Sequence, residues 1–538
     1  MTPFPATFKY TYESNSHIPI LKLYIFNPSS SSSNFTNPKA TLLFDKSLIQ
    51  LTWIDNNQLP VTVWAPLANV LIDADAAVNL RVSDDCIEVK FVLVVPVDHP
   101  VVASFEFGGC GEGDDDEFMP LQLDSDLKKL AACEEVYFYC RGCSTKLTKA
   151  VRIFKEMPSV NWREAADNWF GTCCCSFGGV SEKLVAKYAN LYTCSSGVCL
   201  LDGTSVVLCK DDFVGYKFPD QVESQDHKSL QLSADNGLRK DILDNGITEA
   251  VNVDRNSQNK AVHDFDIKLN CNSDLTSKPD IEGTTKCPPD VRNNMDHGIE
   301  CCHTHADEDQ THDTSELLAN KGSLLNGLLG NCFMVTSPYL SKDIKWSEIS
   351  CPNCSCLLGA YPHDNIDDPS NGFNTSAPLN DSVHLFKCFI STSLPVGGPT
   401  DLFRKYTLER MFTSQLLETA TDELSFRTVV RHLQTRDPML QIILLNPNTW
   451  CSFGDCMDAM VSTLKINLHP AIKVLFSDCS NSTESQLRKL DQWATKNQVD
   501  DVYMLMSRAL TEALEEANSM LPSSHACLQG LSLSFLRR

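Results

Sequence analysis

The chain has 538 residues, of which 42% are hydrophobic, and this length predicts two or three domains with a substantial apolar core. Its formal net charge of −24 argues against nucleic-acid binding and against an anionic membrane surface, and no apolar run approaches the roughly 20 residues that span a bilayer. The 24 cysteines follow a start, Met1 to Pro5, without a signal-peptide pattern. We therefore expect a reducing compartment, the cytosol or the nucleus, with thiols free or metal-bound.

Residues 1 to about 155 are predicted to be rich in β-strands, because short alternating apolar runs are separated by turn residues. The expected strands are Phe8–Tyr12, Ile20–Ile25, Ala40–Phe44, Val61–Trp64 and Val89–Val95. Such strands with frequent turns indicate a β-sandwich or an open barrel. The acidic loop Glu112–Glu117 is interpreted as a solvated turn, with metal binding as the weaker alternative.

Two Cys-x-x-Cys motifs, far apart in the sequence, each have the pattern of a strand, a turn and a second strand. They are Cys140 with Cys143 and Cys351 with Cys354. Two residues between thiols allow both sulfurs to bind one ion at about 2.3 Å. We predict that the four cysteines share one structural zinc ion, which fastens the two ends of the protein together. Ordinary buried thiols are the alternative, and redox chemistry is disfavoured because no βαβ unit surrounds either motif.

A short helix is predicted after the first motif, where Asn161 can act as the cap and Glu164 completes a capping box. Its apolar face is expected to pack on the core. The adjacent thiols Cys173–Cys175 are interpreted as buried or free, with a contribution to the metal site as the weaker alternative. The run from Gly197 to Leu208 predicts a β-hairpin that turns at Asp202-Gly203.

The composition changes from about residue 220 to residue 320. This window carries 21 acidic and 9 basic residues, and its only aromatic residue is Phe265. Such a segment buries too little apolar surface to offset its ordering entropy. We predict a β-rich domain over residues 1–215, a disordered acidic insertion over 216–323 and a C-terminal region over 324–538. The cluster Cys301–His305 resembles metal ligands, but it lacks an ordered shell, so adventitious binding or none is expected.

The C-terminal region is predicted to mix helices and strands. A helix is expected to start at Thr400-Asp401, and Asp500 is expected to cap a last helix. The expected strands are Val383–Thr392, Phe426–Arg431, Leu440–Leu445, Ile472–Phe476 and Leu531–Leu536. The predicted fold class is therefore α+β, with a β-rich N-terminal region and a mixed α/β C-terminal region that are joined by a zinc site and interrupted by a disordered acidic insertion.

Several motifs follow one another in a distinctive order. They are the motif at Cys140, the Asn161-Trp162-x-Glu164 segment with Trp169, the segment Cys199–Leu201, the motif at Cys351 with Leu358-Gly359, and the segment Lys473–Cys479. This order resembles the HECT-like ubiquitin-conjugating-enzyme-binding proteins, which are described as ubiquitin ligases. The resemblance covers nearly the whole chain except the acidic insertion.

The resemblance implies that the protein binds a ubiquitin-charged conjugating enzyme and promotes transfer of ubiquitin to a protein substrate or to itself. HECT-type transfer passes ubiquitin through a cysteine thioester, which needs an accessible thiol that is at least partly thiolate. In the C-terminal third, Cys479 is the best-placed candidate, and Cys451 and Cys456 are weaker ones. An ordinary HECT domain has threonine before the acceptor, whereas this chain has Asp478, whose carboxylate raises a neighbouring thiol's pKa. A loop cysteine without chemistry is therefore the alternative.

Two other function classes are alternatives to the ligase. The first is a non-catalytic, zinc-stapled interaction protein that holds a partner complex. The second is a cysteine protease acting on ubiquitin chains. The protease is disfavoured, because no cysteine and histidine stand in a recognisable nucleophile motif.

Overall fold

The computed structural model describes residues 8–29, 35–55, 58–102, 121–157, 195–216, 332–337, 344–364, 381–422, 424–461, 463–480 and 500–538, with a few isolated positions. By its internal contacts the chain divides into one unit of residues 1–218 and 313–538 and a second unit of residues 219–312. The second unit lies outside the described residues. So do the predictions for Glu112–Glu117, the helix after Asn161, Cys173–Cys175, Cys301–His305 and nearly all of the acidic insertion. The predicted domain boundaries stay predictions.

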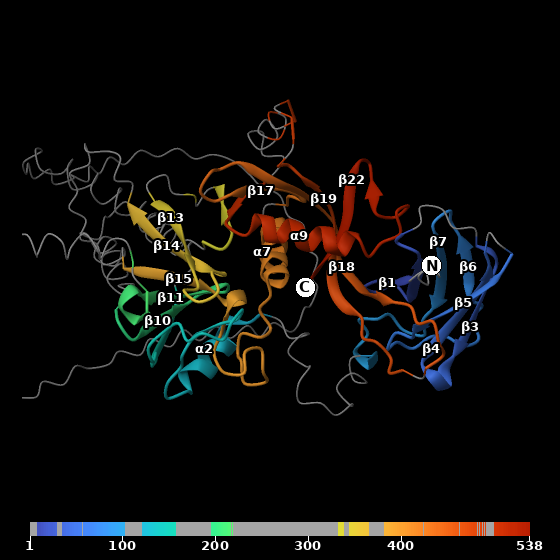
Figure 1. The fold of residues 1–538 in the computed structure, drawn as a ribbon, viewed down its shortest axis with the longest axis horizontal. Coiled ribbons are helices and arrows are strands. Elements are labelled where there is room, and N and C mark those ends of the chain that lie inside the picture. The colour runs from blue at the N-terminus through green and yellow to red at the C-terminus, as the bar shows by residue number, and fades with distance from the viewer. Residues whose placement is uncertain are drawn as a thin grey trace, which may run out of the picture. The chain divides into compact units, whose positions relative to one another are not determined.

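The described part of the chain is rich in β-strands and has few helices. Its largest sheet has 11 strands and combines strands from both ends of the sequence (Figure 1). Along its main path the order is β12 (Val335–Thr336), β20 (Asp500–Met504), β17 (Arg427–His432), β18 (Pro438–Asp455), β1 (Lys9–Asn15), β2 (Ile20–Phe26), β7 (Cys86–Val92) and β6 (Asn79–Val82). Off this path, β19 (His469–Asp478) pairs with β18 and β22 (Leu531–Arg537), and β21 (Cys527–Leu528) pairs with β22.

Strand β18 connects the N-terminal strands of this sheet to its C-terminal strands. Its first residues pair with β17, where Arg427 lies opposite Ile443, and its last residues pair with β1, where Lys9 lies opposite Asp455. The pairing with β19 shifts register twice, on either side of Asn446. These bulges bend the long strand, so that its first part pairs with β17 and its last part pairs with β1. Backbone pairing therefore joins the two regions independently of the cysteines.

The second sheet also interleaves the two halves of the chain. Its order is β13 (Ile344–Ser350), β14 (Leu357–Asp364), β15 (Ser382–Phe386), β11 (Ser205–Cys209), β10 (Val198–Leu201) and β9 (Ile153–Glu156). The hairpin predicted to turn at Asp202-Gly203 is formed by β10 and β11. A small sheet pairs β8 (Tyr139–Cys140) with β16 (Ile390–Ser391) and places the first cysteine motif beside the C-terminal region.

In the N-terminal region, a three-stranded sheet lies against the strands β1, β2 and β7. It consists of β3 (Thr36–Leu43), β4 (Leu48–Ile54) and β5 (Pro60–Pro66). One apolar cluster contains Leu21 and Leu23 of β2 together with Ile49, Leu51 and Val63 of the smaller sheet. Side chains alternate along each strand, so each sheet turns one apolar face toward this core. All five predicted strands are present with altered ends, and β4 and β6 were not predicted.

The structure corrects both predicted helix starts (Figure 1). Helix α7 runs from Leu408 to Asp422, and the predicted start at Thr400-Asp401 is wrong. Asp401 is 1% exposed, and its carboxylate accepts hydrogen bonds from the backbone N–H groups of Thr392 and Phe403, so it stabilises a turn instead. Asp500 begins strand β20, and helix α9 starts at Ser507 and ends at Asn518.

The error at Asp500 has a simple physical cause. Val502 and Met504 are buried while Tyr503 is only half-buried, which is the two-residue period of a strand. Parallel pairing with β17, in which Val502 lies beside Val430, satisfies the backbone. The predicted strand Val383–Thr392 is likewise broken by a 3-10 turn at Lys387–Phe389.

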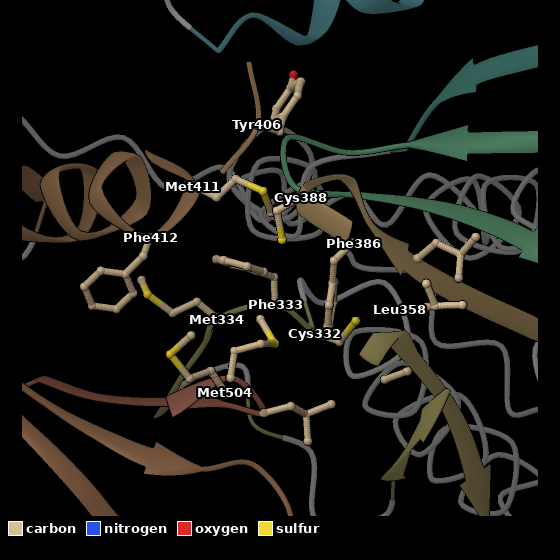
Figure 2. Close-up of a cluster of buried hydrophobic side chains, with 14 of the residues drawn as sticks. Cys332, Phe333, Met334, Leu358, Phe386, Cys388, Tyr406, Met411, Phe412 and Met504 are labelled. Carbon is tan, nitrogen blue, oxygen red and sulfur yellow. The ribbon is translucent and has the colours of Figure 1, made fainter. Parts of the chain in front are cut away.

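The largest apolar cluster lies between the second sheet, helix α7 and strand β20. Figure 2 shows aromatic and sulfur-containing side chains of this cluster together, including Met411 and Phe412 of α7, Met504 of β20, and Phe333 and Met334 from the segment before β12. Thioether side chains are flexible and fill irregular gaps between elements that cross at different angles. Cys140 and Cys351 belong to the same cluster, so the cysteine motifs are anchored in the core. No helix among the described residues is long and apolar enough to cross a membrane.

Candidate functional site

The four cysteines of the two motifs converge. The Sγ atoms of Cys140 and Cys354 lie 3.6 Å apart, as do those of Cys143 and Cys351. All four Sγ atoms lie within 4.8 Å of one another. A tetrahedral ion with metal–sulfur bonds of about 2.3 Å has sulfur–sulfur edges of about 3.8 Å. The donor set and its spacing therefore fit one tetrahedral ion, as the sequence predicted, while the identity of the metal stays a prediction.

The two motifs have the same backbone geometry. The N–H of Ser144 donates to the carbonyl of Cys140 at 2.8 Å, and the N–H of Ser355 donates to the carbonyl of Cys351 at 2.9 Å. Both serines adopt the left-handed conformation, with φ of 60° and 59°. These matching turns point the two thiols of each motif in one direction, so that the motifs meet as equivalent halves.

Burial and hydrogen bonding act in opposite directions on the thiols. Burial raises the pKa of Cys140 and Cys351 above the usual thiol value. Hydrogen bonds from the side chains of Thr145 and Asn353 lower the pKa of Cys143 to about 5. Four thiolates this close together repel one another, and a dication at their centre offsets this repulsion together with the cost of burial.

Gly142 leaves room for the cluster. A Cβ atom at this position would lie 3.2 Å from the Sγ of Cys356 and 3.6 Å from the Sγ of Cys354. A side chain at this position would therefore crowd the thiol of Cys356, while it would touch the predicted ligand Cys354 at an ordinary contact distance. Cys356 is an exposed fifth thiol beside the four, and sequence spacing alone did not single it out.

Arg141, also within the first motif, binds the segment that leads into α7. Its guanidinium donates to the carbonyl oxygens of Tyr406 and Phe403, both at 2.6 Å. Its nearest carboxylate is that of Asp401, at 3.9 Å. The turn that carries the first two thiols is thus held to the C-terminal region by side-chain hydrogen bonds as well as by the β8–β16 pairing.

A buried ionic cluster includes residues of the same segment before α7. Asp126, from helix α2 (Leu123–Ala131), is 1% exposed. Its carboxylate lies 2.7 Å from the Nζ of Lys405 and 3.6 Å from the Nζ of Lys387, and it accepts a hydrogen bond from the Tyr406 hydroxyl. Burial lowers the pKa of Lys387, and Asp126 opposes that effect. Sequence reasoning missed this cluster because its members lie far apart and share no motif.

His384 on β15 is fully buried, and neither ring nitrogen has a hydrogen-bond partner among the residues that the structure describes. Its ring meets that of Trp346 edge to face, with centroids 4.9 Å apart. Burial lowers the pKa of His384 to about 4, so the ring is neutral near pH 7. It therefore serves as an aromatic packing residue.

The structure places Cys479 in an enclosed environment. It follows β19, is 4% exposed and packs with Val429 and Leu490. Burial, followed by the charge of Asp478, raises its pKa. Cys451 is also buried and Cys456 is half-buried, and burial raises the pKa of each to about 12. None of the three is an activated thiol in this conformation. The assignment of Cys479 as the ubiquitin acceptor stays a prediction.

A cavity of about 270 Å³ lies where β18 bends between the two groups of strands. Its lining is Ser16, His17, Asp98, Pro447, Asn448, Thr449, Trp450, Pro470, Ala471 and Arg538. The imidazole of His17 lies 2.8 Å from the carboxylate of Asp98, and the guanidinium of Arg538 donates to the Asn448 side chain at 2.7 Å. The lining therefore combines these polar pairs with the apolar groups of Pro447, Trp450, Pro470 and Ala471.

The chain was compared with models of known protein families. The model of the family described as HECT-like ubiquitin-conjugating enzyme (E2)-binding matches residues 102–238 and 267–533, which is most of the chain. No curated protein and no solved structure matched the chain. The matched residues include all four cysteines of the cluster, Arg141 and the buried ionic cluster.

Proposed function

The chain belongs to the HECT-like ubiquitin-conjugating-enzyme-binding family, and we propose that it is a ubiquitin ligase. Family membership implies a ubiquitin-conjugating enzyme as a partner. In this proposal the protein binds the ubiquitin-charged form of that enzyme and promotes transfer of ubiquitin to a protein substrate or to itself. The family match over most of the chain is the observation that carries the proposal.

The environment of Cys479 favours a particular route. A thiol that takes ubiquitin must reach the thioester of the partner enzyme and must be partly ionised. Cys479 is 4% exposed, and burial and Asp478 both disfavour its thiolate. We therefore propose direct transfer from the conjugating enzyme, with this chain as the rigid body that holds the partner. Transfer through Cys479 would need a conformation that opens the packing with Val429 and Leu490.

We propose that Cys140, Cys143, Cys351 and Cys354 hold one zinc ion, which supplies a fixed tetrahedral cross-link and no reaction step. Four thiolates fill every position of a tetrahedral ion and leave none for a substrate, which is the pattern of a structural site. The residues around the cluster keep it in place: Gly142 leaves space for the sulfurs, and Arg141 attaches its turn to the C-terminal region.

We propose the cytosol or the nucleus as the location. Every cysteine among the described residues is a free thiol, including the exposed Cys133, Cys356 and Cys527. Exposed free thiols persist in a reducing compartment. A fluorescent fusion, imaged together with cytosolic and nuclear markers, checks this, and retention in the secretory pathway would contradict it.

A non-reducing gel with charged conjugating enzyme tests the ligase proposal. Wild-type protein and a Cys479→Ala variant are each mixed with a panel of ubiquitin-charged conjugating enzymes, and loss of the charged band is followed over time. We expect faster discharge with both proteins and no thiol-sensitive ubiquitin adduct. Cys133→Ala, at an exposed thiol, is the matched control.

Each other outcome has a definite meaning. A thiol-sensitive adduct that is lost only in Cys479→Ala would establish the covalent route and contradict direct transfer. Binding of conjugating enzymes without faster discharge would leave the non-catalytic interaction protein as the function. No binding by any member of the panel would contradict the ligase proposal as a whole.

A further inference from the structure

The two cysteine motifs match one residue beyond their turns. In the first motif, the N–H of Cys140 donates to the carbonyl of Thr145 at 2.8 Å, and in the second, the N–H of Cys351 donates to the carbonyl of Cys356 at 2.8 Å. A serine with a left-handed backbone precedes both Thr145 and Cys356. The two residues are therefore at equivalent positions, and the second motif carries a third thiol where the first carries a hydroxyl.

In the first motif, the side chain at this position contacts a metal ligand. The Oγ1 of Thr145 lies 3.1 Å from the Sγ of Cys143. Since the second motif has the same turn, rotation about the Cα–Cβ bond of Cys356 brings its Sγ toward that of Cys354. A Cβ atom at Gly142 would lie 3.2 Å from the first sulfur and 3.6 Å from the second, so the two sulfurs are already no further apart than the sum of these distances.

Cys356 differs from the four ligands in its exposure. Its side chain is exposed, whereas Cys140 and Cys351 are buried and Cys143 and Cys354 are half-buried. Four thiolates complete the shell of a tetrahedral ion, so the ion leaves the thiol of Cys356 unbound beside it. An accessible thiol next to a second thiol that can resolve it is the arrangement of redox-sensing cysteines.

We propose that Cys356 is a peroxide-sensitive thiol that opens the metal site by forming a disulfide with Cys354. This inference rests on the metal site of the proposed function. In the first step, the sulfur of Cys356 attacks one oxygen of hydrogen peroxide, the O–O bond breaks, and the thiol proton leaves with the other oxygen as water. Cys356 is then a sulfenic acid.

In the second step, the thiolate of Cys354 attacks the sulfenic sulfur of Cys356. The S–S bond forms, the S–O bond breaks, and the hydroxide that leaves takes a proton from solvent. In total each sulfur loses one electron, and the two electrons reduce one peroxide molecule to water. The ion keeps three of its four ligands, so its affinity falls and the connection between the two motifs opens.

The geometry of the pair also makes the change reversible. Cys354 and Cys356 are separated by one residue, so their disulfide closes a very small ring and is strained. Strained and exposed disulfides have high reduction potentials and are the labile ones. A cellular thiol reductant would therefore restore both thiols, after which the four ligands can bind the ion again.

The first test follows metal release from the full-length protein, purified reduced and with its metal bound. One equivalent of hydrogen peroxide is added in the presence of a chromogenic zinc chelator. Wild-type protein is compared with Cys356→Thr, which introduces the residue that the first motif has at this position. We expect equal starting metal content and at least fivefold slower release from Cys356→Thr. Cys133→Thr, the same change at another exposed thiol, should release metal as fast as wild type.

The second test identifies the oxidised pair by differential alkylation and mass spectrometry. Thiols that stay free are labelled first, and disulfides are then reduced and labelled with a second reagent. We expect the second label on Cys354 and Cys356 of the wild-type protein, and we expect added reductant to restore metal binding.

The outcomes separate this inference from the metal site on which it rests. Equal release rates for wild type and Cys356→Thr, or an oxidised pair that leaves out Cys356, would overturn the inference and leave the metal site standing. Absence of metal from the reduced wild-type protein would overturn the metal site and this inference together. Discharge of the conjugating enzyme is measured separately and depends on neither result.

Discussion

The N-terminal β region, residues 8–101, and the cysteine-stapled region, residues 121–216 and 332–422, are held together in different ways. Most strand pairs of the first are sequence neighbours, such as β1 with β2 and β4 with β5, around a purely apolar cluster. In the second, β11 pairs with β15 and β8 with β16, and thiols and buried charges lie at or beside the apolar core.

This difference shows that one β-rich protein can be stabilised in one region by apolar burial and in another by specific cross-links. Sequence-neighbour strands close short loops at low entropic cost, so burial of apolar surface suffices to hold them. In the stapled region, the pairings of β11 with β15 and of β8 with β16 close loops of well over a hundred residues, and specific cross-links fix which segments meet. Removing a cross-link should therefore harm the stapled region selectively.

The largest expected effect comes from removing a metal ligand. Cys351→Ser should release the bound metal and lower the free energy of unfolding by at least about 4 kcal/mol, because the three remaining thiols no longer complete a tetrahedron. Elemental analysis and urea unfolding measure the two effects. Cys133→Ser, at an exposed thiol, should change neither. Unchanged metal content in Cys351→Ser would contradict the shared site.

Cys351→Ser also tests whether the two regions unfold separately. In hydrogen-exchange mass spectrometry, peptides from β14 and β15 should lose protection in Cys351→Ser, while peptides from β2 and β7 should retain it. Leu23→Ala, at a fully buried position of the N-terminal core, should give the reverse pattern with metal content intact. Equal loss in both regions for both variants would show that they unfold as one unit.

The next effect concerns the buried ionic cluster. Asp126→Ala leaves Lys387 and Lys405 buried without their carboxylate and should destabilise the protein by about 3 to 5 kcal/mol. Glu512→Ala is the control, because its partner Arg508 is exposed and a surface pair contributes roughly 0 to 1 kcal/mol. Thermal unfolding of both variants measures the difference. A similar loss in the two variants would contradict a special role of the buried cluster.

The smallest expected effect is the pH dependence from His384. Its folded pKa of about 4 lies below the ordinary histidine value of 6.5, so the unfolded chain binds more protons between these values. Stability is therefore fully present above pH 6.5 and should fall by about 3 kcal/mol as the pH approaches 4. His384→Phe, which keeps a ring against Trp346, should remove this part of the slope in urea titrations. Identical slopes for both proteins would contradict the prediction.

Local patterns predicted much of the fold. The two-residue spacing of the thiols, the hairpin turn at Asp202-Gly203 and the strands over Phe426–Arg431 and Leu440–Leu445 all depend on residues close in sequence. The convergence of the four thiols followed from metal chemistry, which makes two half-sites incomplete alone. The family resemblance follows from the order of the motifs along the sequence.

Features set by distant packing could not be predicted. Asp500 has the chemistry of a helix cap, but it begins a strand because β17 offers a parallel partner. Asp126, Lys387 and Lys405 look like ordinary surface charges until α2 is packed beneath the segment before α7. The burial of Cys479 likewise depends on Val429 and Leu490 from other segments.

The bent strand β18 has a consequence for biosynthesis. β1 emerges from the ribosome early, but Asp455, the partner of Lys9, is among the last fifth of the residues to be made. At 5 to 20 residues per second, that delay is roughly 20 to 90 s. During this interval the nascent N-terminal hairpins have an open edge that invites pairing with other chains, so a chaperone that shields β1 co-translationally would raise the yield of correctly assembled protein.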